Sequence, residues 1–345
     1  MIRTRPQLER YLKTINRDSR LAIDTEFKRI NTYCPELCLV QIATTHSVEC
    51  IDVLSINNLE PLFEKLYHNK TEWVVHSARQ DIEALYHLSK RIPVSLFDTQ
   101  IAASLLNYPL QISYQSLTEI LQDVRLDKSF TRFDWTTRPL PANVVEYALD
   151  DVRYLLPNFE KLKHELTISK KIQWLDEETK FLLDYELYNP NIKQICYKTK
   201  GLSQLEKKIQ DKAIKLVAWR ENNAQQKNKP RKWIMTDQKL LDYACGKSKL
   251  STRSQQLFDD FVKESSETLS LSELLIPQKP LTSSEKIKKN ELQRIINSIA
   301  EAYNLPPEVI STSKSLIRFM RGDLSAPLCS GWRAKLFNKE ELNAK

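Results

Sequence analysis

Asp24 and Glu26 stand two residues apart at the end of an apolar stretch, residues 21–27. An apolar entry followed by acid, polar residue and acid is typical of a buried strand that carries two carboxylates where it emerges. Alternate residues of a strand point to the same face, so these carboxylates would lie side by side. Two like charges so close favour a cation between them, which predicts a metal site. The alternative is an ordinary strand end at which both acids are solvated.

Asp81 follows a predicted strand at residues 73–76 and lies in the first turn of a predicted helix, residues 79–88. A helix dipole stabilises an acid in this turn, so a structural charge is one interpretation. Ligands of α/β folds bind beside the carboxyl ends of the strands, which leaves a functional interpretation open.

Asp151 lies in a segment, residues 141–157, that predicts a helix because Pro141 suits a first turn and no Gly or Pro interrupts it before Pro157. At 100° per residue, Tyr147 and Asp151 share an apolar and aromatic stripe, whereas Asp150 falls on a polar one. An acid on the apolar stripe needs a partner, because an unpaired buried carboxylate is costly. A metal ion would be such a partner.

The segments around these acids predict the sheet and helices that must position them. Three strands come first, and strands and helices then alternate, which indicates an α/β fold with a mixed sheet and helices on its faces. The strands are predicted at residues 21–27, 37–43, 48–53, 73–76 and 94–97, and the helices at 59–67 and 79–88.

In order and spacing, these residues match the motifs of a known family. Asp24 and Glu26 match its Asp-x-Glu motif, and Asp81 matches its second-motif aspartate. Tyr147 and Asp151 match its Tyr-x-x-x-Asp motif. The chain thus resembles the ribonuclease D family of DEDDy exonucleases over roughly residues 1–165. The likeness continues between the motifs, in residues 32–35, 97–100, 126–129 and 134–140.

The resemblance implies a ribonuclease H-like fold and an exoribonuclease that removes nucleoside 5′-monophosphates from RNA 3′ ends. It also implies tRNA precursors and other structured RNA 3′ ends as substrates. The four carboxylates offset the charge of two divalent cations, and oxygen ligands suit Mg²⁺ or Mn²⁺. Two such ions about 4 Å apart activate a water and stabilise the leaving oxygen. With an unperturbed pKa of about 10, Tyr147 is expected to orient the attacking water as a neutral phenol.

Two other functions agree with the same residues. One is a catalytically idle nucleic-acid-binding protein that keeps the fold, although such a protein would be free to lose carboxylates and none of the four is missing. The other is a DNA 3′–5′ exonuclease, because the metal chemistry is indifferent to the sugar.

The composition predicts a globular protein of two or three domains, with 345 residues of which 41% are hydrophobic. No run of about 18 apolar residues and no signal-peptide pattern occur, so we expect a soluble, cytoplasmic protein that does not contact membranes. We also expect a monomer. The six cysteines form no pair of Cys-x-x-Cys units, which argues against a zinc site or a disulfide framework.

The net charge of +8 is unevenly distributed, with −3 in residues 1–195 and +11 in residues 196–345. A basic second half predicts a polyanionic partner, and RNA fits the family. The alternative is a lysine-rich solvated surface.

The second half resembles small helical domains of the helicase-and-RNase-D C-terminal (HRDC) type. Residues 202–220 predict a helix, 221–229 a polar loop and a second helix begins near Asp237. We therefore predict an exonuclease domain with trailing helices at residues 1–195, a first HRDC domain at 196–276 and a diverged second copy at 285–345, with a linker over 277–284.

Basic residues of the first HRDC domain are candidates for contacts with RNA phosphates, with Trp233 beside them for base stacking. The alternative is that Trp219 and Trp233 are core residues and the charges belong to a solvated loop. The candidates are Arg220, Lys227, Lys229, Arg231 and Lys232.

Overall fold

The structure is a computed structural model that describes residues 1–127, 129–264 and 280–343, with side chains up to residue 337. It divides into two compact units, one of Met1–Lys28, Leu37–Asp184 and Leu281–Lys345, the other of Arg29–Glu36 and Tyr185–Pro280. The predicted end of the first HRDC domain (265–276), part of the linker (277–279), Lys128 of one matching segment and residues 344–345 lie outside the described residues. The division into three domains stays a prediction.

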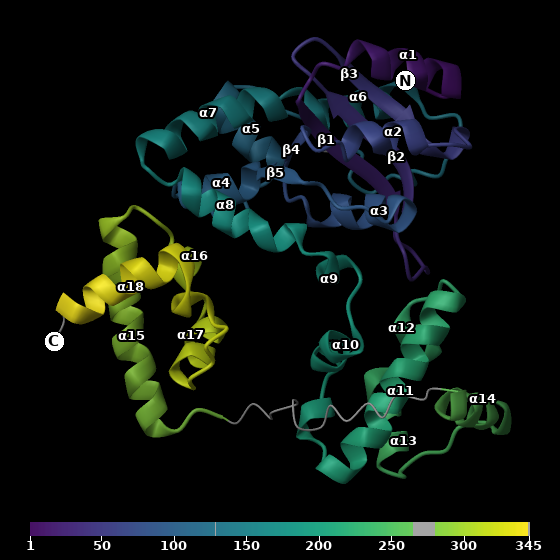
Figure 1. Cartoon of the computed structure of the whole chain (residues 1–345), viewed down its shortest axis with the longest axis vertical. Coiled ribbons are helices and arrows are strands. Elements are labelled where there is room, and N and C mark those ends of the chain that lie inside the picture. Colours follow the sequence, from purple (N-terminus) through teal and green to yellow (C-terminus); the bar gives the residue numbers. More distant parts are fainter. Residues whose placement is uncertain (128, 265–279, 344–345) are drawn as a thin grey trace. The chain divides into compact units, whose positions relative to one another are not determined.

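The first unit is built on a mixed sheet, and the described residues give it five strands in the order β3-β2-β1-β4-β5. Strand β1 lies at its centre, and β4 runs parallel to β1 and β5 parallel to β4, whereas β2 and β3 are antiparallel (Figure 1). Leu21, Ala22 and Ile23 of β1 are fully buried, as expected for a strand covered on both faces. The predicted α/β class is confirmed. The strands are β1 (Arg20–Lys28), β2 (Glu36–Ala43), β3 (Val48–Asp52), β4 (Glu72–Val75) and β5 (Ser95–Asp98).

Helices pack on this sheet, and three of them, α3, α6 and α7, contact the central strand β1. Two of these carry the predicted site residues, because Asp81 lies in α3 and Tyr147 and Asp151 lie in α6. The arrangement of the sheet therefore gathers residues from three distant parts of the sequence. The helices of this part are α1 (Arg5–Thr14), α2 (Glu60–Leu66), α3 (Arg79–Ser89), α4 (Thr99–Leu105), α5 (Tyr114–Gln122), α6 (Ala142–Arg153), α7 (Leu155–Ile168) and α8 (Ile172–Lys180).

The helix predicted over 141–157 is two helices, because α6 ends at Arg153 and α7 begins at Leu155. The hydroxyl of Tyr114 fills the break by donating to the Asp150 carbonyl (3.0 Å) and accepting from the Tyr154 amide (3.1 Å). Pro157 then lies in the first turn of α7, where a missing N–H costs no intrahelical bond. The phase of α6 up to Asp151 is unaffected.

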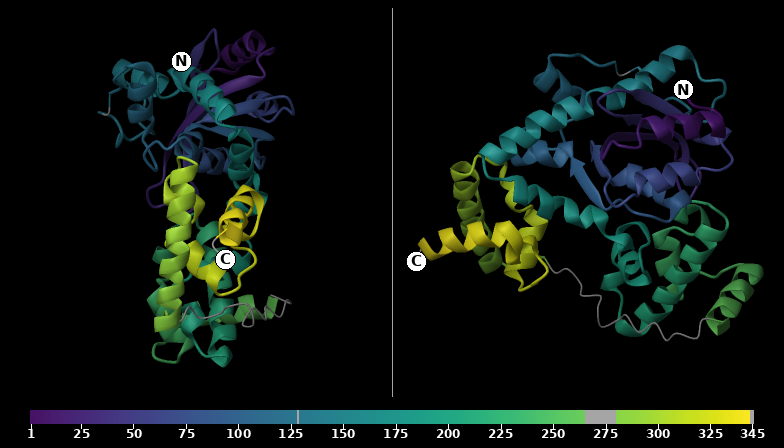
Figure 2. Two further views of the ribbon diagram at one scale, coloured as in Figure 1. Left: turned by 90° about the vertical axis from the view of Figure 1, so that its left-hand side faces the viewer. Right: turned by 45° about the horizontal axis from the view of Figure 1, so that its top comes forward.

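The C-terminal helices of the first unit form a small bundle (Figure 2). Their buried side chains belong to one hydrophobic core with those of α4, α5, α7 and α8. Trp174 of α8 stacks on Trp332 of α18 with ring centroids 4.5 Å apart and planes inclined by 9°. Lys171 donates to the carbonyls of Leu105 (2.8 Å) and Asn304 (3.1 Å). The bundle comprises α15 (Ser283–Ala302), α16 (Pro307–Ile310), α17 (Ser313–Met320) and α18 (Gly331–Asn343).

The second unit is helical and has its own core around α11. Residues 221–226, predicted as loop, are helical, because α11 runs to Gln226. It begins at Lys207, after a 3₁₀ turn at Leu202–Gln204, and not at residue 202. The helices are α9 (Tyr185–Tyr188), α10 (Ile192–Lys198), α11 (Lys207–Gln226), α12 (Arg231–Ile234), α13 (Asp237–Ala244) and α14 (Thr252–Glu264).

The last turns of α11 are held by the loop between β1 and β2, residues 29–36, which belongs to the second unit. Asn228 accepts hydrogen bonds from the amides of Tyr33 (3.0 Å) and Cys34 (3.1 Å). The hydroxyl of Tyr33 donates to the buried carboxylate of Glu221, which Arg231 also binds. These long-range contacts explain why a polar segment continues as helix.

Candidate active site

Three of the predicted carboxylates meet beside the second half of β1. Ligand oxygens of Asp24, Glu26 and Asp151 all lie within 4.8 Å of one another, and each side chain is partly exposed. Asp24 and Glu26 project together because they are two residues apart on a strand. Asp151 reaches them from α6. One cation could therefore bind oxygens from a strand and a helix at once.

Asp81, the fourth predicted acid, lies beside these three but is not part of the group whose oxygens all lie within 4.8 Å of one another. It is 7% exposed, in the first turn of α3, and its Oδ1 accepts a 2.6 Å hydrogen bond from the Thr25 hydroxyl. Its charge nevertheless raises the pKa of Asp24, Glu26 and Asp151. The site thus has a three-oxygen cluster and a separate neighbouring acid.

The protein supplies little positive charge to these acids. Within residues 1–127, 129–264 and 280–343, none of the four forms an ion pair with Lys or Arg. Burial, and then the neighbouring carboxylates, raise the pKa of Asp24 and Glu26 well above the usual range. Burial also raises the pKa of Asp81 and of Asp151 to about 7. A cluster with this charge deficit, made of oxygen donors alone, fits divalent cations such as Mg²⁺ or Mn²⁺.

Tyr147 lies one turn before Asp151 on α6 and is buried among aromatic rings. Its ring centroid is 5.8 Å from that of Phe130 and 6.4 Å from that of Trp135. Burial and the charge of Asp151 raise its pKa to about 12, so the phenol keeps its proton at neutral pH. Asp150 has a different environment, because it pairs with Arg153.

Two residues that support the site were missed by the sequence analysis. Thr25 binds Asp81, and the buried Asp98 accepts hydrogen bonds from the amides of Ser77 (3.1 Å) and Ala78 (2.9 Å), which fixes the entry to α3. Asp98 also caps α4, since Oδ1 accepts from the Gln100 amide. An acid between a strand and a helix is a sequence signal for a cap. The second set of contacts, to α3, has no local signal.

The predicted RNA-contact residues lie in the second unit and differ in availability. Arg220 is 3% exposed and donates to Asp237 (2.6 Å), whereas Arg231 pairs with Glu221. Lys232 is exposed, and Lys229 Nζ lies 5.7 Å from the ring centroid of Trp233. The ring of Trp233 is 53% exposed, while Trp219 is buried in the core and Lys227 bonds to Asn223.

Among the helices that the structure describes, none has the length and apolar character needed to cross a bilayer.

Comparison with known proteins gives one consistent result. Residues 1–167 match the 3′–5′ exonuclease family. A ribonuclease D of Bartonella henselae is 33% identical over 354 aligned positions that cover 96% of this chain and 86% of the relative. A ribonuclease D of Zymomonas mobilis is 30% identical and covers 95% and 89%, respectively.

The crystal structure of Escherichia coli RNase D, described as an exoribonuclease involved in structured RNA processing, superposes with a TM-score of 0.84. It is 24% identical in sequence, and the match covers 99% of this chain and 97% of that one. This likeness confirms the predicted fold, a ribonuclease H-like exonuclease part followed by helical segments.

Proposed function

Because the chain belongs to the ribonuclease D family and is a 3′–5′ exoribonuclease, we propose that it cuts RNA with two divalent cations held by Asp24, Glu26, Asp81 and Asp151. The observation that supports this proposal is the convergence of Asp24, Glu26 and Asp151 within 4.8 Å, in a cluster that no Lys or Arg of the described residues neutralises. The separate position of Asp81 suits the second of two ions better than the first.

Divalent cations, when bound, supply the positive charge that activates a water and stabilises the leaving 3′ oxygen of a phosphodiester. The carboxylates of Asp24, Glu26 and Asp151 hold this charge in place, and Thr25 fixes the orientation of Asp81. All four acids must be ionised to do so, and their raised pKa values mean that this state is unfavourable until cations bind.

Tyr147 acts as a positioning hydroxyl for the attacking water. Its pKa of about 12 excludes it as a general base at neutral pH, since the base form would be a very small fraction. The packing of Phe130 and Trp135 around its ring limits its motion, so that the hydroxyl stays one helical turn from Asp151.

The proposed substrates are tRNA precursors and other structured RNA 3′ ends. The proposed products are nucleoside 5′-monophosphates removed from these ends. The basic second half, +11 over residues 196–345, supports a long polyanionic substrate. We also propose that the protein acts as a cytoplasmic monomer. The presence of all four carboxylates disfavours the idle binding protein.

The test is a single-turnover assay on 3′-labelled RNA and on a DNA strand of the same sequence. We expect release of monophosphates from RNA in Mg²⁺ or Mn²⁺, no release in excess EDTA, and a circular dichroism spectrum that EDTA leaves unchanged. Full activity in EDTA would overturn the metal mechanism, and faster cleavage of DNA would show that the site serves the deoxy sugar.

A further inference from the structure

A cavity of about 330 Å³ opens in the second unit, and its lining comes from α10, α11, α12 and α13 and the segments next to them. Most of the charged residues in this lining are basic. Asp237 is the one acid that lines it among the described residues. The basic lining residues are Lys198, Lys200, Arg220, Arg231 and Lys232.

Two of these cations are neutralised within the protein. Arg220 is buried and donates to Asp237 Oδ1 (2.6 Å) and to the Met235 carbonyl (3.2 Å). Arg231 pairs with Glu221, whose carboxylate lies outside the lining. Asp237 also accepts a hydrogen bond from the backbone amide of Lys200 through Oδ2 (3.1 Å), but among the described residues its ion pair is with Arg220 and not with a lysine.

Three exposed lysines, Lys198, Lys200 and Lys232, are left around the cavity. No ion pair to an acid is formed by any of them within the described parts of the chain. Their charges surround a space of about 330 Å³, which is large enough for a phosphate group with its attached sugar. Such a site favours a compact anion, because Lys binds phosphate as a point charge.

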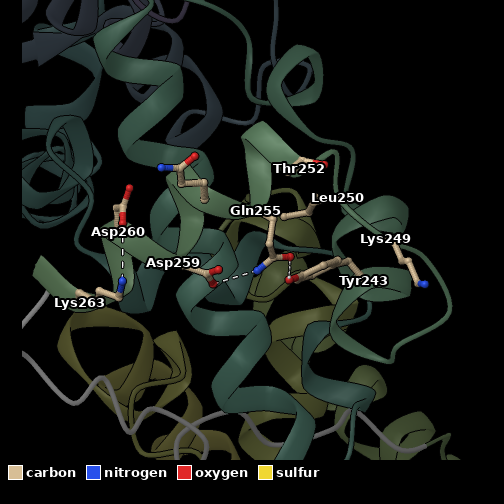
Figure 3. Close-up of a pocket in the computed structure, with 9 residues that line it drawn as sticks. Tyr243, Lys249, Leu250, Thr252, Gln255, Asp259, Asp260 and Lys263 are labelled. Atoms are coloured by element: carbon tan, nitrogen blue, oxygen red, sulfur yellow. Dashed lines mark hydrogen bonds and ion pairs between the residues drawn. The ribbon is translucent and has the colours of Figure 1, made fainter.

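A second cavity of the same unit, of about 590 Å³, shows that this surplus is local (Figure 3). Its lining contains Lys249 and Lys263 but also Asp259 and Asp260, so the charges balance. Lys263 pairs with Asp260 at 3.8 Å, and Gln255 donates to Asp259 (Figure 3). The charge of residues 196–345 is therefore concentrated at some places and cancelled at others.

We propose that the cavity between Lys198, Lys200 and Lys232 binds a phosphate group of the RNA backbone other than the one that is being cleaved. Trp233 follows Lys232 on α12, and its exposed ring offers a surface on which a neighbouring base can stack. This inference rests on the proposed function, because an RNA strand is the polyanion that the active site requires.

The test compares two double variants of the full chain, Lys198→Glu with Lys200→Glu, and Lys247→Glu with Lys249→Glu as the matched control. Both pairs are exposed lysines two residues apart in the second unit, and both remove the same charge. We expect the first variant to weaken binding of a structured RNA roughly tenfold near 0.1 M salt. The slope of log affinity against log salt concentration should fall by the equivalent of about one to two phosphate contacts. The control should change affinity less than about threefold.

Equal loss of affinity in the two variants, at equal melting temperature, would overturn the proposal, since only overall charge would then matter. Inorganic phosphate is the second probe. If the first variant no longer binds phosphate but binds RNA as tightly as the control does, the cavity is a site for free phosphate and not for the RNA backbone. Cleavage of a dinucleotide reports the active site alone and should be the same in wild type and both variants. If wild type fails to release monophosphates from 3′-labelled RNA in Mg²⁺ or Mn²⁺, the proposed function fails, independently of the cavity.

Discussion

Two kinds of carboxylate with a shifted pKa occur in this protein, and they have opposite electrostatic environments. Asp52 is buried and binds Arg138 through Nε (2.8 Å) and Nη2 (2.7 Å). Burial raises its pKa, but the hydrogen bonds from Arg138 and Ser55 outweigh burial and leave the pKa below the usual value. Asp24 and Asp151 are partly exposed and lie among other carboxylates, and their pKa values are raised.

The difference shows which carboxylates have a cationic partner within the folded chain. A carboxylate with an internal cation stabilises the fold by itself, whereas a group of acids without one stabilises it only when protonated or bound to an external cation. The difference therefore separates structural acids from acids arranged for a ligand, with no reference to family membership. Substitutions in the two regions should consequently act in opposite directions on stability, and only those in the active site should lower activity.

The largest effect is expected from Asp151→Asn. An amide keeps the shape but removes a charge that the cations need, so turnover on 3′-labelled RNA at saturating Mg²⁺ should fall roughly a thousandfold or more. Asp150→Asn, at the preceding residue, is the control. Its carboxylate already pairs with Arg153, so this variant should leave turnover nearly unchanged. The reverse result would mean that the metal-facing side of α6 has been misassigned.

Tyr147→Phe should lower the rate less than Asp151→Asn does. Tyr33→Phe is its control. The pKa of each phenol is raised to about 12, in both cases first by burial. Removing the Tyr147 hydroxyl should lower the single-turnover rate about a hundredfold with little change in RNA affinity. Tyr33→Phe should leave dinucleotide cleavage unchanged and lower the melting temperature, because Glu221 loses a donor. A rate loss in Tyr33→Phe alone would contradict both assignments.

Asp52→Asn tests the structural side of the comparison. Arg138 would lose its charged partner in a partly buried position, so the free energy of unfolding should fall by roughly 2 kcal/mol, measured by urea denaturation in EDTA. Asp151→Asn should raise it under the same conditions, since one repulsive charge is removed. If both variants were destabilised equally, the active-site acids would not destabilise the metal-free fold by the charge repulsion that their raised pKa values indicate.

The mildest change is a pH dependence of the metal-free protein. The pKa of Asp81 and of Asp151 is about 7 in the folded chain and about 4 when unfolded, so the folded state binds more protons between these values. The stability that they contribute is present at low pH and is lost as pH rises through about 7. In EDTA, the melting temperature should rise by a few degrees from pH 8 to pH 5 and then fall as acids such as Asp52 protonate. Saturating Mg²⁺ should remove this rise, and a flat profile in EDTA would contradict it.

Periodicity predicted which neighbouring residues share a face, and the match to the family motifs supplied the rest of the site, including Asp81. Alternation on a strand placed Asp24 beside Glu26, and the 100° step of a helix separated Asp151 from Asp150, because these relations depend only on local geometry. The order of strands and helices was likewise enough to predict a mixed sheet. The assignment of metal-binding roles to these residues stays a prediction until the variants are measured.

Other features depend on residues far apart in sequence and could not be predicted. The Thr25 to Asp81 hydrogen bond spans 56 positions, and the helical form of residues 221–226 depends on Tyr33, 188 positions before Glu221. A polar segment has no apolar periodicity to indicate a helix, so its conformation is decided by partners that a local pattern does not contain.

The loop of residues 29–36 has a consequence for how this architecture can be inherited or engineered. The second unit includes a piece of chain inserted between two adjacent strands of the sheet, one of which bears Asp24 and Glu26. Deleting residues 185–280 would therefore remove the helices but leave behind the loop that they hold, with Tyr33 and its neighbours deprived of Glu221 and Asn228. A graft of the helical segment onto another nuclease would need this loop as well, so the unit of exchange is discontinuous in the gene.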